Sequence, residues 1–142
     1  MPAKLAPDEV DAFLDSKPGW IVLSTIGKDG YPHAVPIGYF RLGDEIVMGC
    51  VDGTQKVRNV QRNPRVALSL ESGSSMGDIK GVVIQGDARV VNDPKEKLRY
   101  AREGARRRGV PEGELPTESR PTSAYIVVKR RRVISWDYAR PA

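Results

Sequence analysis

The sequence predicts a mainly β fold with three short helices at its periphery, forming a single domain over residues 1–142. Two observations support this prediction. Most of the apolar segments are short and rich in β-branched and aromatic residues, and turn signals of the hairpin kind join them. The alternation of strands and helices found in doubly wound nucleotide-binding folds is absent. A largely antiparallel sheet or barrel with helical additions is therefore expected.

The strand segments follow one another closely along the chain. They are expected at 20–26, 31–40, 45–50, 65–71, 80–91, 123–129 and 132–137, the last two joined by a charged turn. Pro32 and Pro36 lack the amide donors of a central strand, so 31–40 is expected at a sheet edge or facing a ligand. Gly81 and Gly86 interrupt the long segment 80–91, where they predict a bulge or a close approach of another chain segment.

Three segments have helical signals. Residues 6–16 start with a proline followed by two acidic residues and carry an apolar stripe of Val10, Phe13 and Leu14. Residues 93–109 start with an Asp-Pro cap, and their narrow apolar stripe is Leu98, Ala101 and Ala105. The third helix lies between Thr54 and Asn63, in the stretch around which the rest of the chain is organised.

This central stretch, 52–65, has the features of an anion site. Thr54 is placed to cap the helix by accepting a hydrogen bond from a free backbone amide. The first turn of such a helix presents unpaired N–H donors and a positive dipole end. Lys56 in that turn works against the dipole, which indicates that a negative ligand completes the site. The alternative is an ordinary surface lysine on a short connecting helix.

Composition and charge exclude several classes of function. No apolar run approaches the ~20 residues of a membrane span, and the N-terminus has no signal-peptide core, so a cytoplasmic protein is expected. One cysteine, Cys50, and one histidine, His33, allow neither an internal disulfide nor a structural zinc site, and no metal is expected. The net charge is +5, but the basic clusters at 95–108 and 129–132 lack interleaved aromatic residues, so nucleic-acid binding is not expected.

Several segments together resemble the pyridoxamine-phosphate oxidase-like, split-barrel flavin-binding superfamily. The segments that carry the resemblance are 24–33, 54–59, 62–66, 80–88 and 133–137, in the same order as in the family. The resemblance implies a homodimer of split β-barrels with two cofactor sites at the dimer interface, acting on a small-molecule substrate.

The resemblance also implies which residues hold the cofactor. The phosphate is expected at Thr54, Gln55 and Lys56. The ring and ribityl chain are expected along the strand with His33, Ala34, Val35, Pro36 and Ile37, against the strand end at Gly49 and Cys50, and Trp136 is expected to contact the cofactor from the C-terminal strand.

Departures from the family pattern point away from vitamin B6 phosphate oxidation. Pyridoxamine-phosphate oxidases have an arginine where His33 and Gln55 stand here, a glutamine in place of Gly81, and an arginine-rich tail after the tryptophan. The chain is more similar to the actinobacterial-type branch that uses the deazaflavin coenzyme F-420. Loss of a cradle arginine leaves room for either FMN or F-420.

Surplus positive charge favours the deazaflavin. Its oligoglutamate tail adds carboxylates beyond the phosphate, and the chain supplies Arg58, Arg62, Arg65 and Lys80 as possible partners. The expected function is an oxidoreductase that transfers hydride to or from a small organic substrate. The alternatives are a non-catalytic binding protein of the same fold for a flavin, deazaflavin, haem or fatty acid, and a basic nucleic-acid-binding domain.

No catalytic residue is assigned from the sequence, because the cofactor itself carries flavin and deazaflavin chemistry. His33 is either a hydrogen-bond donor to a ring carbonyl or substrate, or a surface residue of the hairpin. Trp136 is either a cofactor contact or a core residue. In the core, its indole N–H would still need a hydrogen-bond partner. Cys50 is expected to be a small buried hydrophobe and not a nucleophile.

Overall fold

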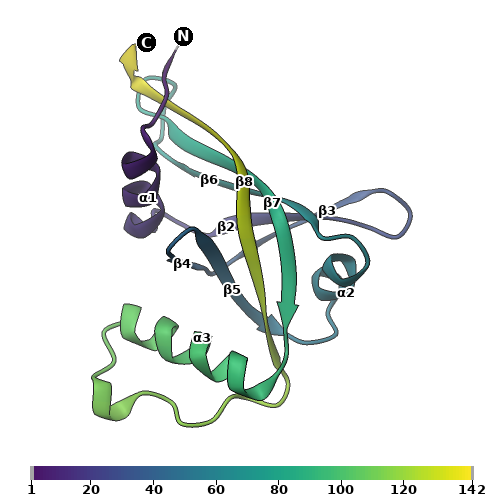
Figure 1. Ribbon diagram of the computed structural model, residues 1–142. Coiled ribbons are helices and arrows are strands. Elements are labelled where there is room, and N and C mark those ends of the chain that lie inside the picture. The colour runs from purple at the N-terminus through teal and green to yellow at the C-terminus, as the bar shows by residue number, and fades with distance from the viewer. Residues whose placement is uncertain (1, 142) are drawn as a thin grey trace.

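The computed structural model describes residues 2–141 and contains one antiparallel sheet that curls into a half-barrel (Figure 1). Its strands have the order β3-β2-β6-β7-β8-β5-β4, and β1 pairs with the end of β8. The strands are β1 (Pro2–Ala3), β2 (Ile21–Ile26), β3 (Pro32–Ile37), β4 (Phe40–Leu42), β5 (Glu45–Val51), β6 (Arg65–Ser72), β7 (Lys80–Val91) and β8 (Ser123–Pro141). The predicted fold class is therefore confirmed.

Three α-helices lie around this sheet. They are α1 (Pro7–Ser16), α2 (Gln55–Arg62) and α3 (Pro94–Arg107), and a short 3-10 turn follows at Glu112–Glu114. In Figure 1, α1 lies near the two chain ends, α2 lies beside the β2–β3 hairpin, and α3 lies at the opposite end of β8 from the termini. The ends of the half-barrel are thus covered by different helices.

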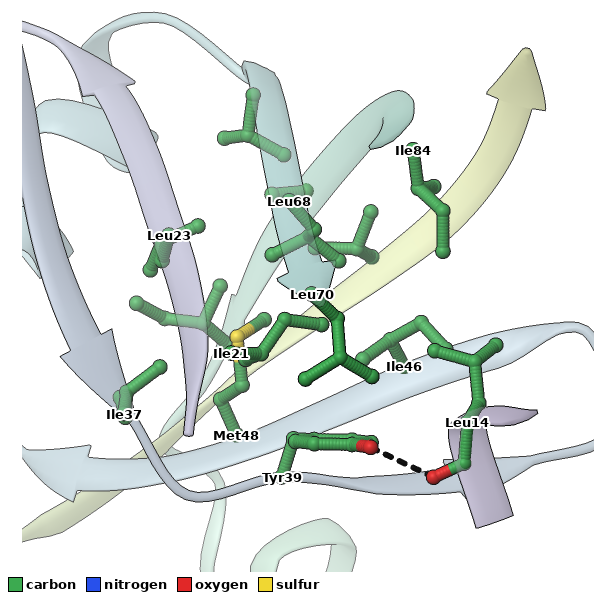
Figure 2. Close-up of a cluster of buried hydrophobic side chains, with 14 of the residues drawn as sticks. Leu14, Ile21, Leu23, Ile37, Tyr39, Ile46, Met48, Leu68, Leu70 and Ile84 are labelled. Carbon is green, nitrogen blue, oxygen red and sulfur yellow. Dashed lines mark hydrogen bonds between the residues drawn. The ribbon is translucent and has the colours of Figure 1, made fainter. Parts of the chain in front are cut away.

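The main core fills the concave side of the sheet. Every second residue of β2 is buried, beginning with Ile21 and Leu23, as the alternation of side chains along a half-buried strand requires. Figure 2 shows these side chains meeting those of β5, β6 and β7. The ring of Tyr39 closes one side of the cluster, and its hydroxyl donates to the carbonyl of Leu14 in α1 at 2.6 Å. This bond fixes α1 against the sheet.

The segment expected as one strand over 31–40 is divided in two. Strand β3 ends at Ile37, Gly38 and Tyr39 turn the chain, and β4 begins at Phe40. β3 is an edge strand paired only with β2, as the prolines at 32 and 36 predicted. Its outer edge is therefore available to a ligand or a partner chain.

The two C-terminal strands expected at 123–129 and 132–137 are in fact one continuous strand, β8. The sequence Lys129–Arg132 has the composition of a turn, but it forms a bulge opposite Gln85 and Gly86 of β7. The bulge accommodates the extra charged residue without ending the ladder. A side chain at Gly86 would collide with the carbonyl of Lys129, which explains this predicted close approach.

Helix α3 buries a different face from the one expected. Its buried residues are Lys97, Tyr100, Gly104 and Ala105, whereas Leu98 and Ala101 are only partly buried. Tyr100 packs with Val47, Val91 and Val127 in a second, smaller cluster on the other face of β5. The prediction is confirmed for Ala105 and wrong for Leu98 and Ala101, because a tyrosine and a lysine occupy the other positions that contact the sheet.

Candidate functional site

The candidate site is built around the start of α2, where three backbone amides point away from the helix. The first intrahelical bond runs from Arg58 N to Thr54 O at 3.0 Å, so the amides of Gln55, Lys56 and Val57 precede it. The predicted cap geometry was wrong: the hydroxyl of Thr54 donates to Val51 O at 2.9 Å and accepts nothing from the helix. The amides at this helix end are therefore left for a ligand or for water.

Lys56 lies beside Cys50, where β5 leads into α2. Burial raises the pKa of the Cys50 thiol, and the nearby Lys56 ammonium opposes part of that rise. The thiol contacts Ala124 O at 3.6 Å and packs against the main core, as expected of a small buried hydrophobe. Within residues 2–141 no carboxylate lies within 4.0 Å of the Lys56 ammonium. A lysine without an internal counter-ion is free to bind an anion.

A polar network holds α2 on β2. Asn59 is fully buried and donates to the hydroxyl of Thr25 at 2.9 Å, while its carbonyl oxygen accepts from Gln55 at 2.7 Å and from Arg62 at 3.0 Å. Arg58 in turn donates to the Gln55 carbonyl at 2.9 Å. The side chain of Gln55 is thus engaged within the protein, so its contribution to a phosphate would come mainly from its backbone amide.

Asn59 lies in the segment 54–59 that carries the family resemblance, but neither Asn59 nor Thr25 was assigned to the site from the sequence. Asn59 stands four residues after Gln55, and residues at this spacing lie on the same face of a helix. That spacing was the signal for the Gln55–Asn59 contact. The pairing with Thr25 depends on how α2 docks on β2, and no local pattern indicates it.

His33 supplies an unpartnered buried nitrogen at the same place. The residue is half-buried on β3, opposite Thr25 of β2, and its Nδ1 is buried with no hydrogen-bond partner among residues 2–141. His33 lines a cavity of about 610 Å³ together with Gln55, Asn59 and residues of the β2–β3 hairpin. Buried polar atoms are rarely left without partners, so this nitrogen marks a place on β3 where the protein's own groups leave a hydrogen bond unmade.

The other strand residues expected in the site divide between two faces. His33, Val35 and Ile37 alternate with Pro36, so Pro36 lies on the outer face of β3. Cys50 packs with the main core, but the neighbouring Gly49 lies on the face that α3 covers, against the Tyr125 ring. Gly49 is therefore separated from Lys56 by the strand itself.

Trp136 lies far from α2 within one protomer. Its ring packs over Gly81, where an added Cβ would come within 2.5 Å of it. In the β7 register, Gly81 pairs with Trp136, whereas Asp87 pairs with Arg65 just after α2. Six residues of strand separate these points, about 20 Å at ~3.3 Å per residue. Lys80 pairs with Asp137 and therefore lies at the same end of β7 as Trp136. Neither Lys80 nor Trp136 is thus near Lys56 of its own chain.

The outer face of the sheet is hollowed close to the first cavity. This second cavity, of about 440 Å³, is lined by Ser24, Arg65, Gln85 and Arg132 among others, and it shares Pro32 with the cavity at His33. Arg65 and Arg132 have no carboxylate within 4.0 Å among residues 2–141, whereas Arg131 is paired with Asp87. Unpaired cations thus line the outer face as well as the start of α2.

The described residues offer neither a metal site nor a membrane-spanning helix. Across residues 2–141, no group of three histidine, cysteine or acidic side chains is arranged to hold a metal ion. In the same part of the chain, no helix is long and apolar enough to cross a membrane.

Comparisons with known proteins agree with this architecture. A conserved hypothetical protein from Mycobacterium tuberculosis is similar with a TM-score of 0.79 and 26% identity, covering 94% of this chain and 86% of that one. An FAD-binding protein from Mesorhizobium loti has a TM-score of 0.70 and 19% identity, covering 95% and 96%. An F420 reductase has a TM-score of 0.65 and 21% identity, covering 87% and 94%.

The last two similarities establish the fold alone, because their identities are low. A search of curated proteins gave no match. The sequence itself matches the pyridoxamine 5'-phosphate oxidase family over residues 6–137, nearly the whole half-barrel. The chain therefore belongs to the pyridoxamine 5'-phosphate oxidase family, which has the split-barrel fold.

Proposed function

We propose that this protein is a homodimeric oxidoreductase that binds the deazaflavin coenzyme F-420, with FMN as the alternative cofactor, at the start of α2. The observation that carries the proposal is a cavity of about 610 Å³, lined by His33, Gln55 and Asn59, beside the uncapped amides at the start of α2. Membership of a family with flavin-type cofactors supports it. When bound, such a cofactor supplies the hydride-transfer chemistry.

The phosphate would lie at the free amides of Gln55, Lys56 and Val57. A helix N-terminus favours an anion, and the Lys56 ammonium adds a charge-assisted hydrogen bond. His33 stands on β3 and lines the same cavity as Gln55 and Asn59, so its half-buried side chain would contact the bound cofactor. These groups bind and orient the cofactor, while α2 is held rigid by the buried Asn59–Thr25 bond.

The proposed dimer follows from the position of Trp136. Since this residue lies about 20 Å along the sheet from Arg65, which follows α2, we expect the contact with a cofactor ring at His33 to come from the partner subunit's Trp136. The exposed Trp20, Val133 and Ile134 are apolar surface that a partner would cover. A second copy of the chain would thus complete the site.

The preference for F-420 over FMN rests on unpaired positive charge. Arg65 and Arg132 line the second cavity, which is next to the cavity at His33. FMN ends at its phosphate, whereas the deazaflavin continues into an oligoglutamate tail whose carboxylates suit these arginines. Lys80 is not part of this group within one protomer, because it lies at the Trp136 end of β7.

Absorbance and binding test the proposal. The protein, purified and supplied with F-420 or FMN, is expected to retain F-420 with the higher affinity at low salt. A catalytic protein should then exchange hydride between the bound cofactor and a panel of small organic acceptors. If it binds neither cofactor, the proposal is wrong. If it binds one and transfers no hydride to any acceptor, the non-catalytic alternative holds.

A further inference from the structure

A buried lysine lies on the other face of β5, away from the His33 cavity. Lys97 of α3 is 2% exposed, and its ammonium donates to the carbonyl of Arg120 at 2.6 Å and to that of Ser123 at 3.0 Å. Within residues 2–141 no carboxylate lies within 4.0 Å of it. An ammonium has three donors, so one remains beyond these two bonds. A buried charge with no counter-ion is costly and is seldom left so.

Lys97 lines a cavity of about 280 Å³ between α3, the 109–122 loop and the start of β8. The apolar part of the wall comes from Ala101, Pro116, Ala124, Gly49 and Tyr125, and two serines, Ser119 and Ser123, add polar groups. Two charged residues, Arg120 and Glu118, also line it, and both are exposed. Counting Lys97, the lining carries one positive charge more than negative.

The wall of this cavity is held in place independently of any ligand. Arg102 of α3 donates to the carbonyl of Pro116 at 3.0 Å, and the amide of Asp52 donates to the carbonyl of Thr122 at 2.9 Å. With the two bonds from Lys97, the loop is thus anchored to both α3 and the end of β5. A pre-formed cavity needs little reorganisation to bind a small molecule.

We propose that this cavity binds a small organic carboxylate, with the carboxylate on Lys97 and the apolar body against Tyr125. A volume of about 280 Å³ exceeds the ~30 Å³ of one water several-fold, so the cavity has room for a small organic molecule. The buried ammonium selects a negative group, and the Tyr125 ring and the small apolar residues select an uncharged body.

Amide chemical shifts of the full-length protein, titrated with sodium benzoate, test the proposal. Benzoate is expected to shift the amides of Ala101, Ser123 and Tyr125 in a saturable way, with benzamide and inorganic phosphate at least tenfold weaker. Benzamide has the same body without the charge, and phosphate has the charge without the body. Equal binding of either control, or no saturable shift at these amides, overturns the proposal.

Two substitutions separate ligand binding from the anchoring of the loop. Lys97→Met keeps the length of the side chain and should weaken benzoate at least tenfold; an unchanged affinity overturns the proposal. Glu118→Gln removes an exposed negative charge from the lining and should strengthen benzoate about two- to fivefold. If Lys97→Met does not fold, Glu118→Gln decides, because an affinity equal to that of the wild type contradicts an anion in the cavity. This site is independent of the cofactor proposed above, so either can fail alone.

Discussion

Substituting Lys56 by alanine should weaken cofactor binding at least tenfold. Its ammonium has no carboxylate partner within residues 2–141, so removing it breaks no internal ion pair. A charge-assisted hydrogen bond to phosphate contributes on the order of 1.5–3 kcal/mol, which corresponds to tenfold or more in affinity. The unfolding free energy should change by no more than ~0.5 kcal/mol, as for other surface substitutions.

Arg131→Ala is the matched control for this experiment. Its side chain is 72% exposed and is paired with Asp87 on the convex side of the sheet. An exposed ion pair contributes about 0–1 kcal/mol to stability, and Arg131 is not at the start of α2. Arg131 also lines the second cavity beside Arg132, so the control is read with FMN, which has no tail: Arg131→Ala should keep wild-type affinity for FMN.

Fluorescence titration of both variants with each cofactor gives the four dissociation constants. Lys56→Ala should also raise the pKa of the Cys50 thiol further, since the ammonium now opposes the effect of burial, and the thiol should react more slowly with an alkylating reagent. If Lys56→Ala binds both cofactors as tightly as Arg131→Ala does, Lys56 is not in the site and the reasoning from its missing counter-ion is refuted.

Four other predictions test the dimer, the cofactor preference, one titrating group and one close contact. Light scattering at micromolar concentration should give a homodimer, and a monomer would contradict the shared site. F-420 affinity should fall more steeply with salt than FMN affinity, and equal slopes would contradict binding of the tail by Arg65 and Arg132. Burial raises the pKa of Tyr39 to about 12, so its contribution to stability is complete below pH ~10 and is lost as the pH rises toward 12. Denaturant titrations should show that loss, at most about 2.7 kcal/mol, and Tyr39→Phe should not show it. Gly86→Ala should destabilise by about 1–3 kcal/mol through its clash with Lys129, whereas Gly19→Ala, with open space around it, should not; equal midpoints would contradict the close contact.

The fold could be predicted because its signals are local. Strand β7 was expected at 80–91 and is observed at Lys80–Val91, and the pair of prolines placed β3 at an edge. The charged run at 129–132 was wrongly predicted to be a turn, because its composition is typical of one. The strand β8 is continuous there because it pairs with β7 over the whole length of β7. Tertiary pairing overrides local preference at such points.

The candidate site was predictable only in part, for a related reason. The position of Lys56 in a helical first turn follows from the sequence around it. The burial of Lys97 does not, because a lysine within the basic cluster 95–108 is assigned to solvent until the packing of Tyr100 on the same helix is known. The orphaned nitrogen of His33 likewise depends on where α2 docks, which no segment of the sequence specifies alone.

The register of β7 has a thermodynamic consequence if the proposed site is correct. Lys56 and Trp136 belong to opposite ends of the same sheet, so one cofactor that contacts both must bridge two subunits. Binding of that cofactor and association of the subunits are then linked, and each must strengthen the other by the same factor. A cofactor held by one protomer alone would leave the dimer dissociation constant unchanged. The dependence of dimer stability on cofactor concentration therefore reports where Trp136 acts, independently of any hydride transfer.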